Sequence, residues 1–218
     1  MRLVDVSGGV VTIDAMGCQK EIAGAVVAAK GDYVLALKDN QPTLHQAVVD
    51  HLLSRWEAEF AGDKVGRRQD EETGHGRRES RTYIQLEAPE SLPGFKSWRG
   101  LKSIGVVISE TQRDGKTTDE ARYYISSLAV EPDAKTFAHA VRSHWSVENC
   151  CHWTLDVTFR EDESRIREKR LRENMAWLNR FCLSLLKQHP GRQSVAMKRR
   201  SCGWSDDFLM QIITGSTS

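Results

Sequence analysis

Two short apolar runs joined by one helical segment constrain the fold of the first 60 residues most strongly. Residues 9–14, GVVTID, are rich in β-branched side chains and end in an acid, which predicts a buried strand. Residues 18–30 have helical periodicity and stop at Gly31, and YVLALK at 33–38 predicts a second strand. Two strands with short links to one helix form a βαβ unit, so we expect these strands to be parallel. A longer helix is predicted over 42–60.

Parallel strands would bring two charged side chains to one edge of the sheet. Asp14 and Lys38 each follow a predicted strand, and Asn40 lies two residues further on. The carboxyl ends of neighbouring parallel strands face the edge at which open α/β sheets bind ligands. Two roles stay open for Asp14, a ligand-binding carboxylate or the N-cap of the helix that follows. Lys38 could hold a phosphate or form an ion pair with Asp14.

A β-rich block separates this part from the helices of the C-terminal third. Residues 61–80 are polar and predict a loop, and Asp114-Gly115 is a hairpin signal. Three strands are predicted, over 81–87, 102–112 and 121–130. Helices are predicted over 134–154, 165–188 and 204–213. We therefore divide the chain into four segments: 1–60, the β-rich 61–132, the helical 133–190, and a tail with a short helix, 191–218.

The composition is that of a soluble globular protein. Of 218 residues, 39% are hydrophobic and 28% are charged, and the formal net charge of +1 does not indicate a nucleic-acid partner. No apolar run approaches the ~18 residues of a membrane span, and the N-terminus lacks the apolar core of a signal peptide. The five cysteines form no CxxC pair, which favours reduced thiols. The expected location is the cytoplasm.

Glu148 takes an unexpected place on the first of the predicted C-terminal helices. On a helical wheel Val141, Val147, Cys151 and Leu155 fall within about a third of a turn, the arc that would pack on a core. Glu148 lies inside this arc. Because a buried carboxylate is costly when alone, it must be neutralised, paired or bound to a metal.

Three explanations of this inward carboxylate stay open on the residues alone. Glu148 could pair with a basic residue of a neighbouring element. It could share a zinc ion with His144 and His152, which lie four residues to either side on the same stripe of the helix. It could instead join Asp14 in a magnesium site, because hard oxygen ligands from separate elements suit Mg²⁺. Two such ions on shared carboxylates are the arrangement that catalyses phosphodiester chemistry.

Four motifs together resemble the DDE transposases of bacterial insertion sequences, in particular the group that includes the H-repeat-associated proteins. They are VVTIDAMGCQ, YVLALKDNQ, HGRRESR and HWSVENCCHWTLDVTFRED, and the resemblance runs from about residue 3 to the C-terminal helix. It implies a partial ribonuclease-H-like α/β fold with a β-rich insertion before the last catalytic helix. It makes Asp14 the second and Glu148 the third metal-binding acid of the catalytic triad. The implied reaction is DNA strand cleavage and strand transfer with Mg²⁺ or Mn²⁺, two ions in the complete site.

The resemblance also implies DNA contacts among the basic and polar residues. The family signature around the glutamate is degenerate, because Val141, His144 and Leu155 replace its Tyr, Arg and Lys. The candidate contacts are Lys38, Asn40, His75, Arg77, Arg81, Arg142, His144, Arg165, Arg167 and Arg170. For HGRRESR, an exposed basic loop or a structural link to the active site are the alternatives. Arg165, Arg167 and Arg170 are expected on the long C-terminal helix as sequence-independent phosphate contacts.

A first catalytic aspartate is implied upstream of this chain. The sequence therefore predicts the C-terminal portion of a transposase, with residues 1–60 as the second half of the ribonuclease-H-like core, inactive by itself. The alternative is a non-catalytic DNA-binding remnant that modulates a full-length transposase, in a homo-oligomer or a mixed assembly. A third class is a small zinc hydrolase that uses His144, Glu148 and His152. No membrane partner is expected.

Overall fold

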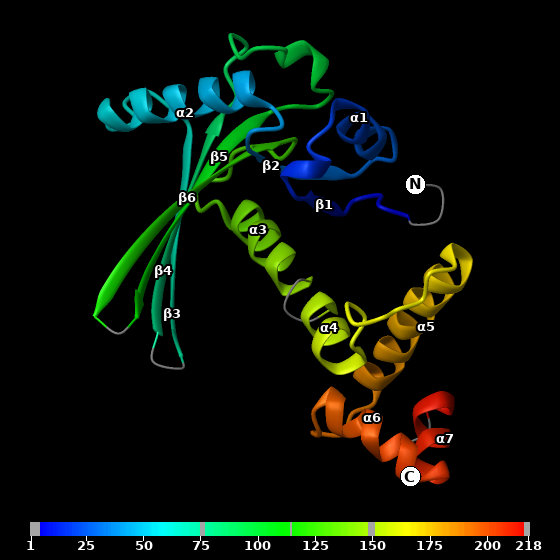
Figure 1. Cartoon of the computed structure of the whole chain (residues 1–218). Coiled ribbons are helices and arrows are strands. Elements are labelled where there is room, and N and C mark those ends of the chain that lie inside the picture. The colour runs from blue at the N-terminus through cyan, green and yellow to red at the C-terminus, as the bar shows by residue number, and fades with distance from the viewer. Residues whose placement is uncertain (1–4, 75–76, 114, 148–150, 216–218) are drawn as a thin grey trace. The chain divides into compact units, whose positions relative to one another are not determined.

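The computed structural model describes residues 5–74, 77–113, 115–147 and 151–215 (Figure 1). The chain forms two compact units, Met1–His144 and Trp145–Ser218. Among the described helices, none combines the length and the apolar character that a membrane crossing requires.

The first unit is built on one mixed sheet of six strands in the order β1-β2-β6-β5-β4-β3. The strands are β1 Val10–Ile13, β2 Asp32–Leu37, β3 Val65–Gly74, β4 Arg77–Glu87, β5 Ser103–Arg113 and β6 Lys116–Ser126. The expected βαβ unit is confirmed, because β1 pairs with β2 in parallel and α1 (Lys20–Ala28) connects them. The other neighbours are antiparallel, and β2 pairs with β6. The strands of the β-rich block therefore extend the same sheet, and the class is mixed α/β.

Helices cover the two faces of this sheet with separate apolar cores. On one face, α1 and α2 (Pro42–Glu57) pack on the side chains of Leu35, Ile84 and Ile125. On the other face, α3 (Lys135–Val147) packs through Phe137 on Tyr124, with ring centroids 5.7 Å apart in an edge-to-face arrangement. The two faces follow from strand alternation, because successive side chains point to opposite sides of a strand.

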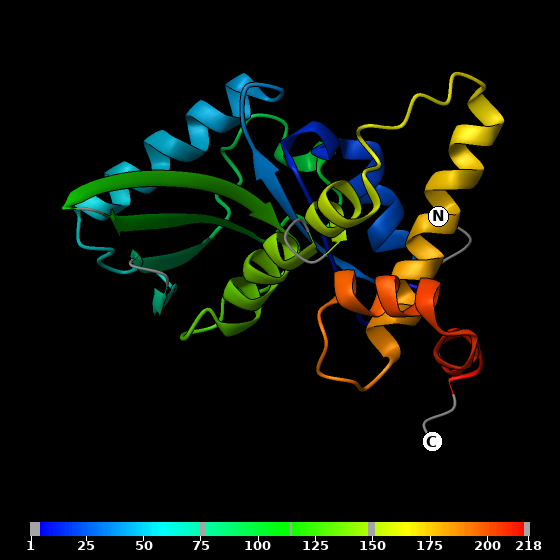
Figure 2. The ribbon, with the colours of Figure 1, turned by 60° about the horizontal axis from the view of Figure 1, so that its bottom comes forward.

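The outer halves of β3 to β6 extend away from these cores as two long hairpins (Figures 1 and 2). The loop predicted for residues 61–80 is therefore wrong, because residues 65–74 form β3 and pair with β4 from Val65–Leu86 to Gly74–Arg77. This strand carries polar side chains on both faces, so the apolar alternation that signals a strand is absent. Cross-strand ion pairs such as Arg78–Glu71 take the place of apolar contacts. For the same reason β6 begins at Lys116, five residues before the predicted strand.

The second unit contains four helices in its described residues. They are α4 Trp153–Phe159, α5 Lys169–Gln188, α6 Val195–Trp204 and α7 Asp206–Thr214. The helix predicted from residue 165 begins at Lys169, because the Glu168 carboxylate caps it by accepting hydrogen bonds from the amides of Arg170 and Leu171. The helix predicted over 204–213 corresponds to α7, and α6 before it was not predicted.

The helix predicted over 134–154 corresponds to α3 and α4, and residues 148–150 between them lie outside the described residues. Val141 and Leu155 are buried as predicted, but Val147 is 52% exposed, so its assignment to the core was wrong. The physical reason is the position of the sheet edge. His144, one turn earlier, contacts Thr12 on β1, which is the last strand at this edge among the described residues.

Candidate functional site

Asp14 follows β1 at the carboxyl end of the parallel strands. Its Oδ1 accepts a hydrogen bond of 3.2 Å from the amide of Gly17 and so caps the short 3-10 turn Ala15–Gly17. Asp14 is therefore a capping residue, but of this turn and not of the predicted helix, whose N-cap is Gln19. This hydrogen bond leaves the side chain of Asp14 with further acceptor positions, because a carboxylate has two oxygens and Asp14 is exposed.

The loop after β2 is tied to the loop that carries Asp14. The side-chain amide of Asn40 donates to the carbonyl oxygens of Ala15 and Cys18, and Nε2 of Gln41 donates to the same Cys18 oxygen at 3.1 Å. Asn40 was expected from the sequence to contact DNA, and in the structure its amide positions the Asp14 loop. Gln41 was not predicted, although it ends the motif YVLALKDNQ.

Lys38 lies just past the end of β2 and is exposed. Lys38 acts electrostatically on Glu120 of β6. The hydrogen bond from Arg122 lowers the pKa of Glu120, desolvation partly opposes this, and the charges of Arg122 and Lys38 lower the pKa further. Among the ion pairs of the described residues, none joins Lys38 to Asp14. Leu37 lies opposite Tyr123, so strand alternation places Lys38 on the same side of the sheet as Arg122, and Lys38 stays a candidate for phosphate contact.

The donors near Asp14 are oxygens and not thiolates. Cys18, the nearest cysteine in the chain, is fully buried, and burial raises the pKa of its thiol to about 12. A thiol that stays protonated is a poor metal ligand, so hard cations such as Mg²⁺ fit this loop better than zinc. Within the described ranges, no group of three or more His, Cys, Asp or Glu side chains could hold a metal ion. Glu148 lies outside those ranges.

His144 connects α3 to the strand that leads to Asp14. Its Nδ1 lies 3.2 Å from Oγ1 of Thr12, which is two residues before Asp14 on β1. Thr12 was not predicted as a functional residue. The signal was its position, since it is the polar residue of the apolar run VVTI and alternation places it on the face of the sheet that α3 covers.

Three of the predicted DNA contacts come together in one ion-pair network on that face. Arg142 of α3 binds both carboxylate oxygens of Glu72 on β3, at 2.5 and 2.6 Å, and Arg81 of β4 lies 3.4 Å from Glu72. Arg81 also pairs with Glu79, which is only 8% exposed and pairs with Arg77 as well. Part of the basic motif HGRRESR is thus tied to α3 through Glu72.

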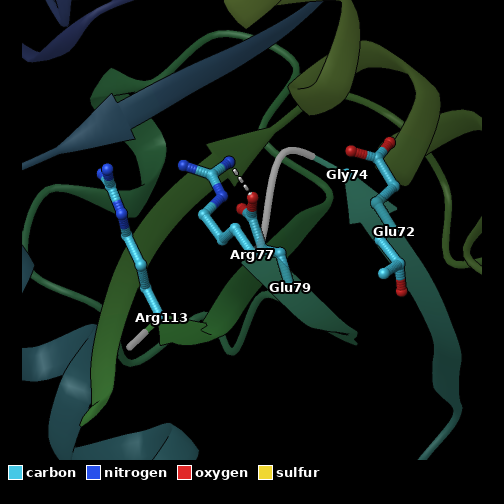
Figure 3. Close-up of a pocket in the computed structure, with 6 residues that line it drawn as sticks. Glu72, Gly74, Arg77, Glu79 and Arg113 are labelled. Atoms are coloured by element: carbon cyan, nitrogen blue, oxygen red, sulfur yellow. Dashed lines mark hydrogen bonds and ion pairs between the residues drawn. The ribbon is translucent and has the colours of Figure 1, made fainter. Parts of the chain in front are cut away.

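The network has a direct electrostatic effect on Glu72. Desolvation raises the pKa of this carboxyl group, but the hydrogen bond and charge of Arg142, together with Arg81, outweigh it, so the pKa lies below its usual range. A hollow of about 680 Å³ lies beside the network, lined by Glu72, Thr73, Gly74, Arg77, Glu79 and Arg113 (Figure 3). His75, the remaining candidate of this motif, lies outside the described residues.

The last three candidates belong to the second unit. Arg165 and Arg167 lie in the irregular segment before α5, and Arg170 lies in its first turn. Their expected place on the long helix was therefore wrong for the first two, because Glu168 caps the helix after them. All three side chains are exposed.

Comparison with known proteins decides the family. The transposase DDE domain model matches residues 1–186. The chain belongs to the DDE transposase family. The resemblance drawn from the four motifs is thereby confirmed.

Relatives in this family include two proteins of Escherichia coli. The chain is 35% identical over 218 residues to "Putative transposase YncI" of E. coli O157:H7, covering 98% of this chain and 55% of the relative. It is 31% identical over 229 residues to "H repeat-associated putative transposase YhhI" of E. coli K12, covering 99% of this chain and 57% of the relative. The DDE transposase thus belongs to the H-repeat type, and it spans about half the length of the curated relatives that it matches.

Proposed function

We propose that this chain carries catalytic residues of a DDE transposase that cleaves DNA strands and transfers them to a target, with Asp14 and Glu148 as metal-binding carboxylates. The observation that carries the proposal is the contact between His144 and Thr12. Thr12 precedes Asp14 by two residues on β1, so this contact ties α3 to the strand that leads to Asp14. Glu148 follows His144 by four residues in the sequence and lies outside the described residues. We further propose that the β1–α1–β2 unit and α3 belong to a ribonuclease-H-like core.

The donor set supports Mg²⁺ or Mn²⁺ as the bound ion. Asp14 offers an exposed carboxylate, and Asn40 and Gln41 hold its loop through backbone carbonyls. When bound, such ions activate the attacking oxygen and stabilise the leaving one. The chain's own residues then have three roles: Asp14 and Glu148 bind, Asn40 orients the Asp14 loop, and His144 with Lys38 contacts the DNA strand.

The proposal is tested by strand cleavage and strand transfer on DNA that carries the element's own ends, in Mg²⁺ or Mn²⁺. We expect any cleavage and strand transfer by the wild type to be abolished in Asp14→Asn and Glu148→Gln while DNA binding persists, because each substitution removes a proposed metal ligand. Glu71→Gln is the matched control, because Glu71 is an exposed carboxylate on the face of the sheet that α3 does not cover. Cleavage that survives Asp14→Asn would contradict the proposal.

The second candidate is a DNA-binding chain that does not cleave but modulates a full-length transposase in a mixed assembly. It is supported by the exposed basic residues Lys38, Arg165 and Arg167, since phosphate contacts of this kind need no metal ion. Wild type that binds end DNA, shows no cleavage in either metal and lowers the activity of a full-length relative would support this second function.

A further inference from the structure

Two half-buried cysteines of the second unit have no role in the proposed function. Cys182 lies on α5 and Cys202 on α6, and both carry free thiols. The two helices pack against each other. The sequence contains no CxxC pair, so these thiols become neighbours only if the fold of the helices brings them together.

A buried lysine shows which faces of the two helices meet. Nζ of Lys198, on α6, donates to the carbonyl oxygens of Leu186 and His189 at the end of α5, at 3.1 and 2.6 Å. Lys198 is only 5% exposed, so its ammonium group lies inside the contact. These hydrogen bonds satisfy carbonyl groups that the end of a helix leaves without intrahelical partners. The face of α6 that carries Lys198 therefore packs on the face of α5 that carries Leu186.

The two cysteines lie one turn further along these same faces. Cys202 follows Lys198 by four residues and Cys182 precedes Leu186 by four, and this spacing keeps residues on one face of a helix. The connection between the helices, residues 190–194, is short, so α6 folds back over the last turns of α5 (Figure 2). The turn of α6 that carries Cys202 thus lies against the turn of α5 that carries Cys182.

An electrostatic effect between the two thiols agrees with this placement. Burial raises the pKa of the Cys202 thiol, a hydrogen bond from its own backbone lowers it, and the charge of Cys182 raises it further. Charges on partly exposed groups act over short distances, because water and salt screen them. The shared helix faces and the electrostatic effect both place the two sulfur atoms close together.

We propose that Cys182 and Cys202 form a redox modification site, in which a low-molecular-weight disulfide such as oxidised glutathione converts the two thiols into one disulfide between α5 and α6. One thiolate attacks a sulfur of oxidised glutathione, which forms a mixed disulfide and releases one reduced glutathione. The second thiolate attacks the protein sulfur of the mixed disulfide and releases the other. The two protein thiols lose two electrons and two protons, and the two released glutathione thiols take them up.

A disulfide at this place would also restrain α4. Arg199 of α6 donates to the carbonyl oxygen of Thr158, and its guanidinium lies 4.8 Å from the centre of the Phe159 ring. Thr158 and Phe159 form the end of α4, the helix that follows the segment of Glu148. Because α6 contacts both α4 and α5, a covalent bond between α5 and α6 would limit the movement of α4 as well.

The test is a peptide map of the full chain after incubation in mixtures of oxidised and reduced glutathione. The remaining thiols are blocked with N-ethylmaleimide, and the tryptic peptides are weighed without reductant. Trypsin cleaves after Lys and Arg, so Cys182 and Cys202 lie in separate peptides, 181–187 and 201–218. We expect these two peptides to be joined, with the loss of two hydrogen atoms, in a fraction that rises with the share of oxidised glutathione. Dithiothreitol should separate them.

Variants distinguish this pair from the other cysteines. Cys202→Ser should remove the cross-link and leave glutathione on Cys182. Cys151→Ser is the matched control, because Cys151 is another half-buried cysteine of the same unit, and it should keep the cross-link. Oxidation should slow hydrogen exchange at residues 156–160 of wild type and not of Cys202→Ser. Circular dichroism confirms that each variant is folded.

Three outcomes would overturn the inference. Glutathione on both peptides without a cross-link would show that the two thiols lie too far apart to be bridged. A cross-link from peptide 181–187 to peptide 143–160 would assign the disulfide to a different pair. A cross-link found only in a covalent dimer on a non-reducing gel would place the bond between two chains. None of these outcomes bears on the proposed function, which cleavage of end DNA tests separately.

Discussion

The close packing of α3 on the sheet depends on a glycine at position 105, because any larger residue would add a Cβ there. A Cβ at this position of β5 would lie 2.5 Å from Cζ and 3.0 Å from Cε1 of Phe137, and 3.1 Å from the carbonyl oxygen of Ile84. Carbon atoms in good contact are about 3.5–4.0 Å apart, so the ring must retreat by about 1 Å. Phe137 is 1% exposed and packed on Tyr124, which leaves it little room. We therefore predict that Gly105→Ala lowers the free energy of unfolding by about 1–3 kcal/mol.

Urea denaturation followed by circular dichroism measures this loss. Gly74→Ala is the matched control, since it lies on the same face of the sheet with open space around its Cβ, and should change stability by less than about 0.5 kcal/mol. Phe137→Leu placed in the Gly105→Ala background should recover part of the loss, because the two positions are in contact and couple. Identical unfolding curves for wild type and Gly105→Ala would refute the account of how α3 is held. Strand cleavage should fall too, because α3 carries His144.

Three further predictions concern the ion-pair network and the Asp14 loop. Glu79→Gln should lower the free energy of unfolding by about 2–4 kcal/mol, because it leaves the nearly buried Arg81 with one acidic partner. Glu71→Gln, at an exposed ion pair, should lower it by less than about 1 kcal/mol, and urea denaturation of both variants measures the difference. The pKa of Glu72 is lower in the folded than in the unfolded chain, so its contribution to stability is present above the unfolded pKa and is lost as the pH falls through the folded pKa. The difference in free energy of unfolding between wild type and Glu72→Gln should therefore shrink as the pH is lowered from 5. A difference that stays constant with pH would contradict this prediction. Asn40→Ala should raise hydrogen exchange at Gly17 and Cys18 and weaken Mn²⁺ binding, while exchange in β5 stays unchanged.

Apolar patterning located both strands of the first part of the fold, but only β2 is largely buried. The prediction that residues 9–14 form a buried strand is wrong, because β1 lies at the edge of the sheet. The βαβ unit followed from runs such as YVLALK, whose residues are needed in the core regardless of what surrounds them. Residues 65–74 have no such signature. They form a strand because β4 supplies hydrogen-bond partners and opposite charges along their length. The sequence of residues 65–74 alone therefore does not predict this strand.

The candidate site was predictable to a similar degree. Strand order brings Asp14 and Lys38 to one edge, and this needs only the parallel βαβ rule. The role of Arg81 was not predictable, because its partners Glu72 and Glu79 become neighbours only through the register of β3 with β4. Thr12 was not predicted because threonine is common in strands. Only its contact with His144 of α3 distinguishes it.

The central proposal is that Asp14 and Glu148 are ligands of one metal site. Mn²⁺ binding, measured by electron paramagnetic resonance, tests it most directly in wild type, Asp14→Asn, Glu148→Gln and the double variant. Two ligands of one site act as a unit, so each single substitution should weaken binding strongly and the double should add little to either. Losses that simply multiply in the double variant, or Mn²⁺ binding that ignores Asp14, would contradict the account.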